Sequence, residues 1–179
     1  MRRHYVLAGL CAMMLTVGCS TISSVRYDYD TETDFGDLKT YDWLDESTGM
    51  NAIEAKRIKN AIDTELKARG YSRSLDDPDF VVAFHGTSAE KVNVVDQGYR
   101  YCPYGRYCYG YWGWGPAATT YTYEEGTLII DFISSKSLEM IWRGEAKGVL
   151  DPNMSAEKLE QVTNEAVKRI LQNFPPPAK

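Results

Sequence analysis

Two stretches of the chain repeat apolar residues at the spacing of an amphipathic helix. The first lies between Asn51, a residue type that caps helices, and Gly70, a residue type that ends them. The second begins after Ser155 and stops before the prolines at 175–177, which lack the backbone N–H of a helix. Their apolar faces consist of Ile58, Ile62 and Leu66, and of Leu159, Val162, Ala166 and Ile170. We therefore predict two helices, each with one face to bury.

Other segments alternate apolar and polar residues with the period of two that is typical of a half-buried strand. They are residues 25–30, 38–44, 79–89, 119–124, 127–133 and 138–147, with residues 92–95 as a further strand beside 79–89. Gly126 predicts a bulge or turn between two of them. The order β-β-α-β-β-β-β-α predicts an α+β fold: a two-layer domain in which two helices pack on one face of an antiparallel sheet.

The N-terminus has the pattern of a secretory signal. Two arginines precede an uncharged apolar run at residues 5–17, which is shorter than the about 20 residues of a membrane-spanning helix. The run leads to Leu-Thr-Val-Gly-Cys, which resembles the lipobox of bacterial lipoproteins. We predict a signal peptide over residues 1–18 and lipid on Cys19. By resemblance to the sorting rule of two-membrane bacteria, Ser20 rather than Asp after this cysteine implies anchoring in the outer membrane, facing the periplasm. The alternative is an ordinary signal peptide with a chance cysteine.

The remaining chain has the size of one domain. We predict a lipidated tether at 19–24, a single domain at 25–175 with an aromatic and glycine-rich insertion at 97–115, and a proline-rich tail at 176–179. Removing the signal leaves 18 basic and 25 acidic residues, a formal net charge of −7. A chain of this charge without a basic cluster is a poor partner for nucleic acid or anionic lipid. We therefore expect no nucleic-acid partner, and membrane attachment through the lipid on Cys19.

Two cysteines remain in the exported domain besides the lipidated one. Cys102 and Cys108 form an even pair in an oxidising compartment, and we predict a disulfide between them. A zinc site is the alternative, although two thiols supply half of the usual ligands and no histidine lies near them. Thiol titration of the mature protein distinguishes the two possibilities.

The segment 97–115 is unusually rich in aromatic residues. It holds eight of the chain's 22 aromatic side chains together with five glycines. Exposed aromatic rings with polar tips are typical of binding surfaces, and here they would contact a protein, a glycan or lipid headgroups. The candidate binding residues are Tyr99, Tyr101, Tyr107, Tyr109, Tyr111, Trp112 and Trp114. The alternative is a flexible loop without a specific ligand.

The sequence offers little for catalysis. His85 is the one histidine left after signal removal, and a hydrolase would pair it with Asp79 or Asp131. No nucleophile motif accompanies it, so we assign no catalytic residue and no cofactor. The alternating acidic residues at 28–34 lack the glycine and the final carboxylate of a calcium-binding loop, so we predict no metal site and interpret them as a solvated face.

Seven short motifs, in this order, resemble a widespread family of bacterial lipoproteins classed as a domain of unknown function. They are Val25-Arg26-Tyr27-Asp28-Tyr29-Asp30, Asp34-Phe35, Lys39-Thr40-Tyr41-Asp42-Trp43, Asp77-Pro78-Asp79-Phe80, Glu125-Gly126-Thr127-Leu128, Trp142-Arg143-Gly144 and Phe174-Pro175-Pro176. The resemblance implies a cell-envelope lipoprotein and supplies no activity. Our hypothesis is a non-catalytic envelope lipoprotein that binds a partner protein or envelope glycan through its aromatic segment; an envelope hydrolase or a purely structural lipoprotein are the alternatives.

Overall fold

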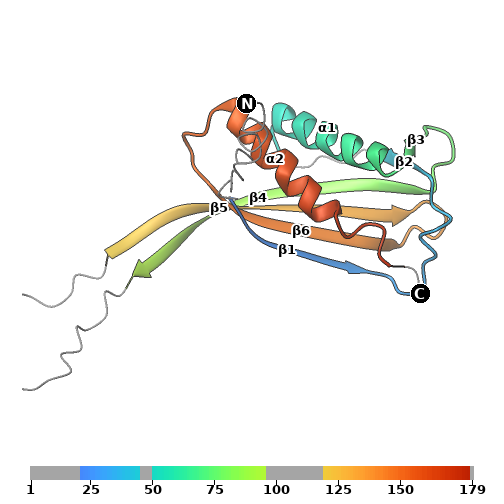
Figure 1. Ribbon diagram of the computed structural model, residues 1–179, viewed down its shortest axis with the longest axis horizontal. Coiled ribbons are helices and arrows are strands. Elements are labelled where there is room, and N and C mark those ends of the chain that lie inside the picture. Colours follow the sequence, from blue (N-terminus) through green and yellow to red (C-terminus); the bar gives the residue numbers. More distant parts are fainter. Residues whose placement is uncertain (1–20, 45–49, 96–118, 178–179) are drawn as a thin grey trace, which may run out of the picture.

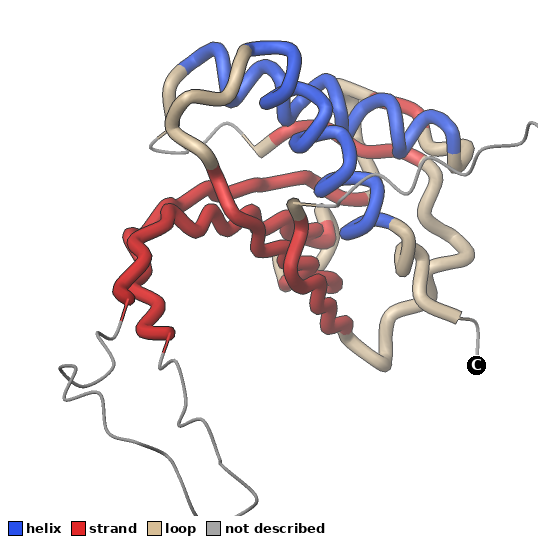
Figure 2. Tube along the Cα trace, turned by 60° about the vertical axis from the view of Figure 1, so that its left-hand side comes forward, coloured by secondary structure: helices blue, strands red, loops and turns tan. Residues whose placement is uncertain are grey.

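The computed structural model describes residues 21–44, 50–95 and 119–177, which form one sheet covered by two helices (Figure 1). The strands are β1 (Ile22–Tyr29), β2 (Thr40–Trp43), β3 (Ser72–Arg73), β4 (Phe80–Val95), β5 (Thr119–Ser134) and β6 (Met140–Leu150). Helices α1 (Ala52–Ala68) and α2 (Ala156–Leu171) lie on the same face of the sheet (Figure 2). The two-layer α+β architecture is thus confirmed.

The helices begin and end where the local sequence predicts. The Asn51 side chain accepts hydrogen bonds from the backbone N–H groups of Ile53 and Glu54, both at 3.0 Å, and so caps α1. Gly70 follows the end of α1 with a φ of 89°, a conformation that favours glycine. Ser155 caps α2 by accepting from the backbone N–H of residue 158 at 3.3 Å.

The prediction of a wholly antiparallel sheet is wrong. The strand order is β1-β6-β5-β4-β2-β3, and β2 runs parallel to both of its neighbours while the other pairs are antiparallel. The cause is α1, which follows β2 and carries the chain back along one face of the sheet before β3 and β4 begin. Strand β3 was not predicted, because two exposed residues carry no apolar alternation.

Two predicted interruptions are also absent. Residues 80–95 form one strand, and β5 pairs with it without a break from Thr119 to Ser134. Gly126 therefore lies within a ladder, opposite Ser88 on one side and Gly148 on the other, and not in a turn. The end of β4 that leads to Val95 and the start of β5 at Thr119 extend beyond the helices as a two-stranded arm (Figure 1).

The predicted tether is shorter than expected. Strand β1 starts at Ile22, so the last three residues of the interval 19–24 already belong to the sheet, and Ile22 is 8% exposed. The chain therefore enters the folded body soon after Cys19. None of the helices in the described part of the chain is long and apolar enough to cross a membrane.

The core lies between the helices and the sheet and is closed at one end by aromatic rings. Phe174, three residues after the end of α2, packs edge-on against Phe132 at 4.5 Å between ring centroids and also contacts Phe80 and Trp142. Trp142 in turn stacks on Phe132 at 5.0 Å. The buried faces of both helices join this cluster. The core therefore depends on residues from β4, β5, β6 and the segment after α2.

Candidate binding site

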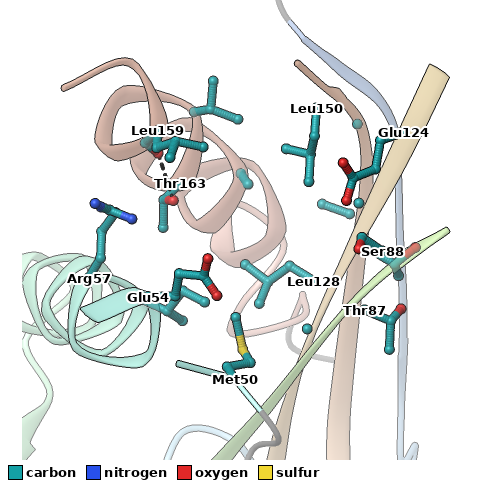
Figure 3. Close-up of a pocket in the computed structure, with 18 of the residues that line it drawn as sticks. Met50, Glu54, Arg57, Thr87, Ser88, Glu124, Leu128, Leu150, Leu159 and Thr163 are labelled. Carbon is teal, nitrogen blue, oxygen red and sulfur yellow. Dashed lines mark hydrogen bonds between the residues drawn. The ribbon is translucent and has the colours of Figure 1, made fainter. Parts of the chain in front are cut away.

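A cavity of about 380 Å3 lies between the first halves of the two helices and the sheet (Figure 3). It sits where the arm of β4 and β5 leaves the folded body. Its labelled lining residues are Met50, Glu54, Arg57, Thr87, Ser88, Glu124, Leu128, Leu150, Leu159 and Thr163. Its size is within the usual range for small-ligand pockets, about 300–1,000 Å3.

Glycines in three adjacent strands create this hollow. Gly86 of β4, Gly126 of β5 and Gly148 of β6 form its floor, and the last two are direct partners across the sheet. A Cβ atom on Gly86 would lie 2.6 Å from Cε of Met50, and one on Gly126 would lie 2.6 Å from Cδ1 of Leu150. The missing side chains thus let Met50 and Leu150 approach the sheet and leave the remaining space open.

The rim of the cavity is polar and carries two carboxylates, Glu54 and Glu124, and one guanidinium, Arg57. Figure 3 shows Glu54 reaching from α1 and Glu124 from β5 toward the same space. The hydroxyl of Thr163 donates a hydrogen bond to the carbonyl of Leu159 at 2.8 Å, so its proton is already used. An apolar floor with a few polar groups at the rim is the usual arrangement of a binding pocket.

On the helix-free face of the sheet, the groups that a His85 hydrolase requires are not brought together. Both oxygens of Asp131 accept hydrogen bonds from the guanidinium of Arg143, at 2.6 and 2.7 Å. Asp79 accepts from the backbone N–H groups of Lys39 and Thr40 at 2.8 and 2.9 Å. Within the described residues, His85 forms no hydrogen bond or ion pair with either carboxylate. The pairing that the alternative hydrolase hypothesis requires is therefore not assembled among the described residues.

The Asp131–Arg143 pair instead stabilises the open face of the sheet. Asp131 is 3% exposed although no helix covers this face, because the half-exposed side chain of Arg143 lies against it. The two residues are direct cross-strand partners on β5 and β6. The hydrogen bonds to the carboxylate raise the pKa of Arg143 above its ordinary value.

The acidic residues after β1 have local structural roles. Asp30 accepts from the N–H of Glu32 and the hydroxyl of Thr33, and Asp34 accepts from the N–H of Gly36. Such bonds from Asp to the following residues stabilise turns. Among the described residues, no group of three or more His, Cys, Asp or Glu side chains is arranged to hold a metal ion.

The residues predicted to carry function lie outside the described ranges. They are Cys19, Cys102, Cys108, Tyr99, Tyr101, Tyr107, Tyr109, Tyr111, Trp112 and Trp114. For the residues between 96 and 118, the structure shows the two described positions that flank them: β4 ends at Val95, and β5 begins at its partner Thr119. The predictions of lipidation, of the disulfide and of aromatic binding therefore stay predictions.

Sequence reasoning missed the cavity. Gly126 was interpreted as a turn signal, and the small residues Gly86 and Ser88, Ala146 and Gly148 were not considered as a floor. The available signal is their spacing, because small residues two positions apart in a strand share one face of the sheet.

The fold and the site together define an α+β domain with a mixed six-stranded sheet, two helices on one face, and a cavity at the base of a protruding arm. A family described as "Domain of unknown function (DUF4136)" matches residues 25–176. The chain belongs to this family, which confirms the resemblance to a domain of unknown function. No curated protein matches it by sequence.

Two solved structures share the fold. A PDZ domain protein from Parabacteroides distasonis is 14% identical with a TM-score of 0.58, over 88% of this chain and 36% of that one. The chain thus spans about a third of that protein's length. A PelC dodecamer from Paraburkholderia phytofirmans is 10% identical with a TM-score of 0.50, over 87% of this chain and 99% of that one. At these identities, the likeness is one of fold alone.

Proposed function

We propose that this protein is a non-catalytic lipoprotein of the bacterial cell envelope, anchored in the outer membrane by lipid on Cys19. Its aromatic segment, residues 97–115, binds a partner protein or an envelope glycan. The signal pattern and the lipobox-like sequence support the address. The arm supports the binding role, because its two strands end at Val95 and begin at Thr119, directly before and after the stretch of chain that contains this segment.

The observation that carries the proposal is the position of the cavity at the base of the arm. Ser88 and Glu124 belong both to the cavity lining and to the two strands that lead to the aromatic segment. A peptide or glycan chain held by the aromatic rings therefore has a second, preformed contact surface beside the body. Glu54 and Glu124 outnumber Arg57 among the charged lining residues, and this net negative charge favours a neutral or cationic ligand over an anionic one.

The binding role is tested with a variant in which Tyr107, Tyr109, Trp112 and Trp114 are all changed to Ala. Purified peptidoglycan and detergent-solubilised envelope proteins serve as separate baits, which distinguishes glycan from protein. We expect the variant to lose retention by the bait that holds the parent protein. Unchanged retention by both baits would show that the aromatic segment is not the binding surface.

A matched control removes apolar side chains that lie away from the arm. Leu75 and Leu138 are 75% and 78% exposed on loops of the body, and their double change to Ala should leave retention unchanged. Changing Ser88 to Leu fills the cavity floor and should weaken retention without abolishing it, because the aromatic contacts remain.

The address is tested independently of binding. Labelled palmitate should be incorporated into the parent protein and not into a Cys19→Ala variant. Fractionation of the membranes should place the parent protein in the outer membrane, and a Ser20→Asp variant in the inner membrane. Palmitate label on the Cys19→Ala variant would contradict the proposed anchor.

A further inference from the structure

Strand β1 forms one edge of the sheet, and no other described strand pairs with its outer side. The N–H of Asp30 donates to the carbonyl of Ile141 on β6 at 2.9 Å, so the even-numbered residues of this part of the chain direct their backbone groups inward. The backbone groups of Val25, Tyr27 and Tyr29 then point outward, because direction alternates along a strand. The outward N–H of Tyr29 is bonded to the carboxylate of its own neighbour, Asp28, at 2.9 Å.

The side chains along this edge have a regular arrangement. Tyr27 is 44% exposed on the helix side of the sheet and stacks on Tyr29 at 6.3 Å between ring centroids. Arg26 and Asp28 are exposed on the opposite side. The edge thus combines outward backbone groups that no other described strand pairs with, an exposed aromatic ring, and two opposite charges that are two residues apart. Of the outward N–H groups, that of Tyr29 would have to exchange its bond to Asp28 for a bond to an incoming strand.

We propose that β1 pairs antiparallel with β1 of a second copy of this chain, with Tyr27 opposite Tyr27 on the two-fold axis. In this register, Arg26 of each copy faces Asp28 of the other, so two opposite-charge pairs form. The two Tyr27 residues exchange their outward backbone hydrogen bonds, and their rings meet on the helix side. The two sheets then form one continuous sheet with all helices on the same face.

The charges select this register over its neighbours. In an antiparallel pair of two copies, the residues with outward backbone groups in one copy lie opposite residues with outward backbone groups in the other. The outward residues are all odd-numbered, so the two-fold axis passes through a residue position and that residue faces its own copy. An axis at Arg26 would place two arginines opposite each other, and an axis at Asp28 would do the same with two carboxylates. Charged side chains commonly protect an edge strand from pairing. Here their order is complementary to a second, antiparallel copy.

The register is tested by cysteine crosslinking of the full-length protein in its own membrane, with Cys102 and Cys108 changed to Ser. In the proposed pair, the Cα atoms of the two Tyr27 residues are about 5.5 Å apart. This separation is within the about 4.4–6.8 Å that a disulfide spans. A Tyr27→Cys variant should therefore form a disulfide-linked dimer.

A matched control uses the neighbouring positions. The Arg26→Cys variant alone should not crosslink, because residue 26 of the second copy lies diagonally across the two-fold axis and not opposite it. Arg26→Cys and Asp28→Cys chains expressed together should crosslink to each other, because these two positions face each other. Absence of a dimer for a folded Tyr27→Cys protein would overturn the proposal. Equal crosslinking by Arg26→Cys alone would also overturn it, since that result indicates random collision.

Charge reversal tests the same pairing without cysteines. Arg26→Asp or Asp28→Arg alone should weaken co-purification of differently tagged copies by roughly tenfold or more, because like charges then face each other. The two variants expressed together should recover it, since each supplies the charge that the other needs. Failure of the mixture to recover would refute the register. The aromatic variant of the previous section should dimerise normally, which separates this inference from the proposed function.

Discussion

The Gly144→Ala substitution tests how tightly the core packs against β6. A Cβ atom at residue 144 would lie 2.3 Å from Cη2 of Trp142 and 2.4 Å from Cγ2 of Ile170. Carbon atoms in favourable contact are about 3.5–4.0 Å apart, so both neighbours would have to move by more than about 1 Å. Trp142 is 1% exposed and Ile170 is fully buried, so both side chains are enclosed by other parts of the core.

The position of Trp142 makes this movement costly. Its ring stacks on Phe132 at 5.0 Å and meets Phe174 at 5.4 Å, so a shift of the indole displaces other buried rings. Added atoms in a well-packed core typically cost about 1–3 kcal/mol. For a chain of this size, each kcal/mol lowers Tm by about 2–4 °C, so we expect a decrease of about 2–12 °C.

The matched control is Gly126→Ala, in the neighbouring strand. There the added Cβ would lie 2.6 Å from Cδ1 of Leu150, the far end of a flexible side chain beside an open cavity. Leu150 can rotate into that space, so the free energy of unfolding should change by less than about 1 kcal/mol. Urea unfolding followed by circular dichroism measures both variants. If they differ by less than about 0.5 kcal/mol, the argument from rigid packing at Trp142 is wrong.

Two further predictions concern the charged groups of the sheet. Arg143→Ala removes both hydrogen bonds to the buried carboxylate of Asp131 and should lower the free energy of unfolding by about 2 kcal/mol in urea titrations. A double variant with Thr at positions 131 and 143 should lose less, because it leaves no buried charge unpaired. Equal losses in the two variants would contradict this role of the ion pair. At Asp79, two backbone N–H donors hold the pKa of the carboxyl below its ordinary value. The stabilisation is therefore present above the ordinary Asp pKa and is lost as pH falls through the lower pKa of the folded state. Asp79→Asn should destabilise the protein at pH 7 and progressively less toward pH 3. A constant difference in the free energy of unfolding across this range would refute the prediction.

The structure also explains one of the family's short motifs. In Trp142-Arg143-Gly144, the first and third residues share the helix side of β6, where the indole ring covers the glycine. The middle residue points to the opposite face and binds Asp131. The three adjacent residues therefore serve two different layers of the sheet, which alternation along a strand requires.

The helices of this protein could be predicted from the sequence because their signals are local. The cap at Asn51, the apolar spacing along α1 and the glycine after it all act within a few residues of chain. The two-layer architecture could also be predicted from the sequence, since two amphipathic helices and several alternating strands must bury their apolar faces against each other.

Other features depend on contacts between distant segments, which the sequence alone does not specify. The parallel direction of β2 results from the path of α1, and the uninterrupted pairing of β4 with β5 overrides the turn signal of Gly126. The cavity exists because glycines of three strands are brought side by side, although they are far apart in the chain. Capping and periodicity are properties of neighbouring residues, and they determined the elements and their buried faces. Strand order, direction and the shape of the site were decided by tertiary packing, because only the folded sheet brings those residues into contact.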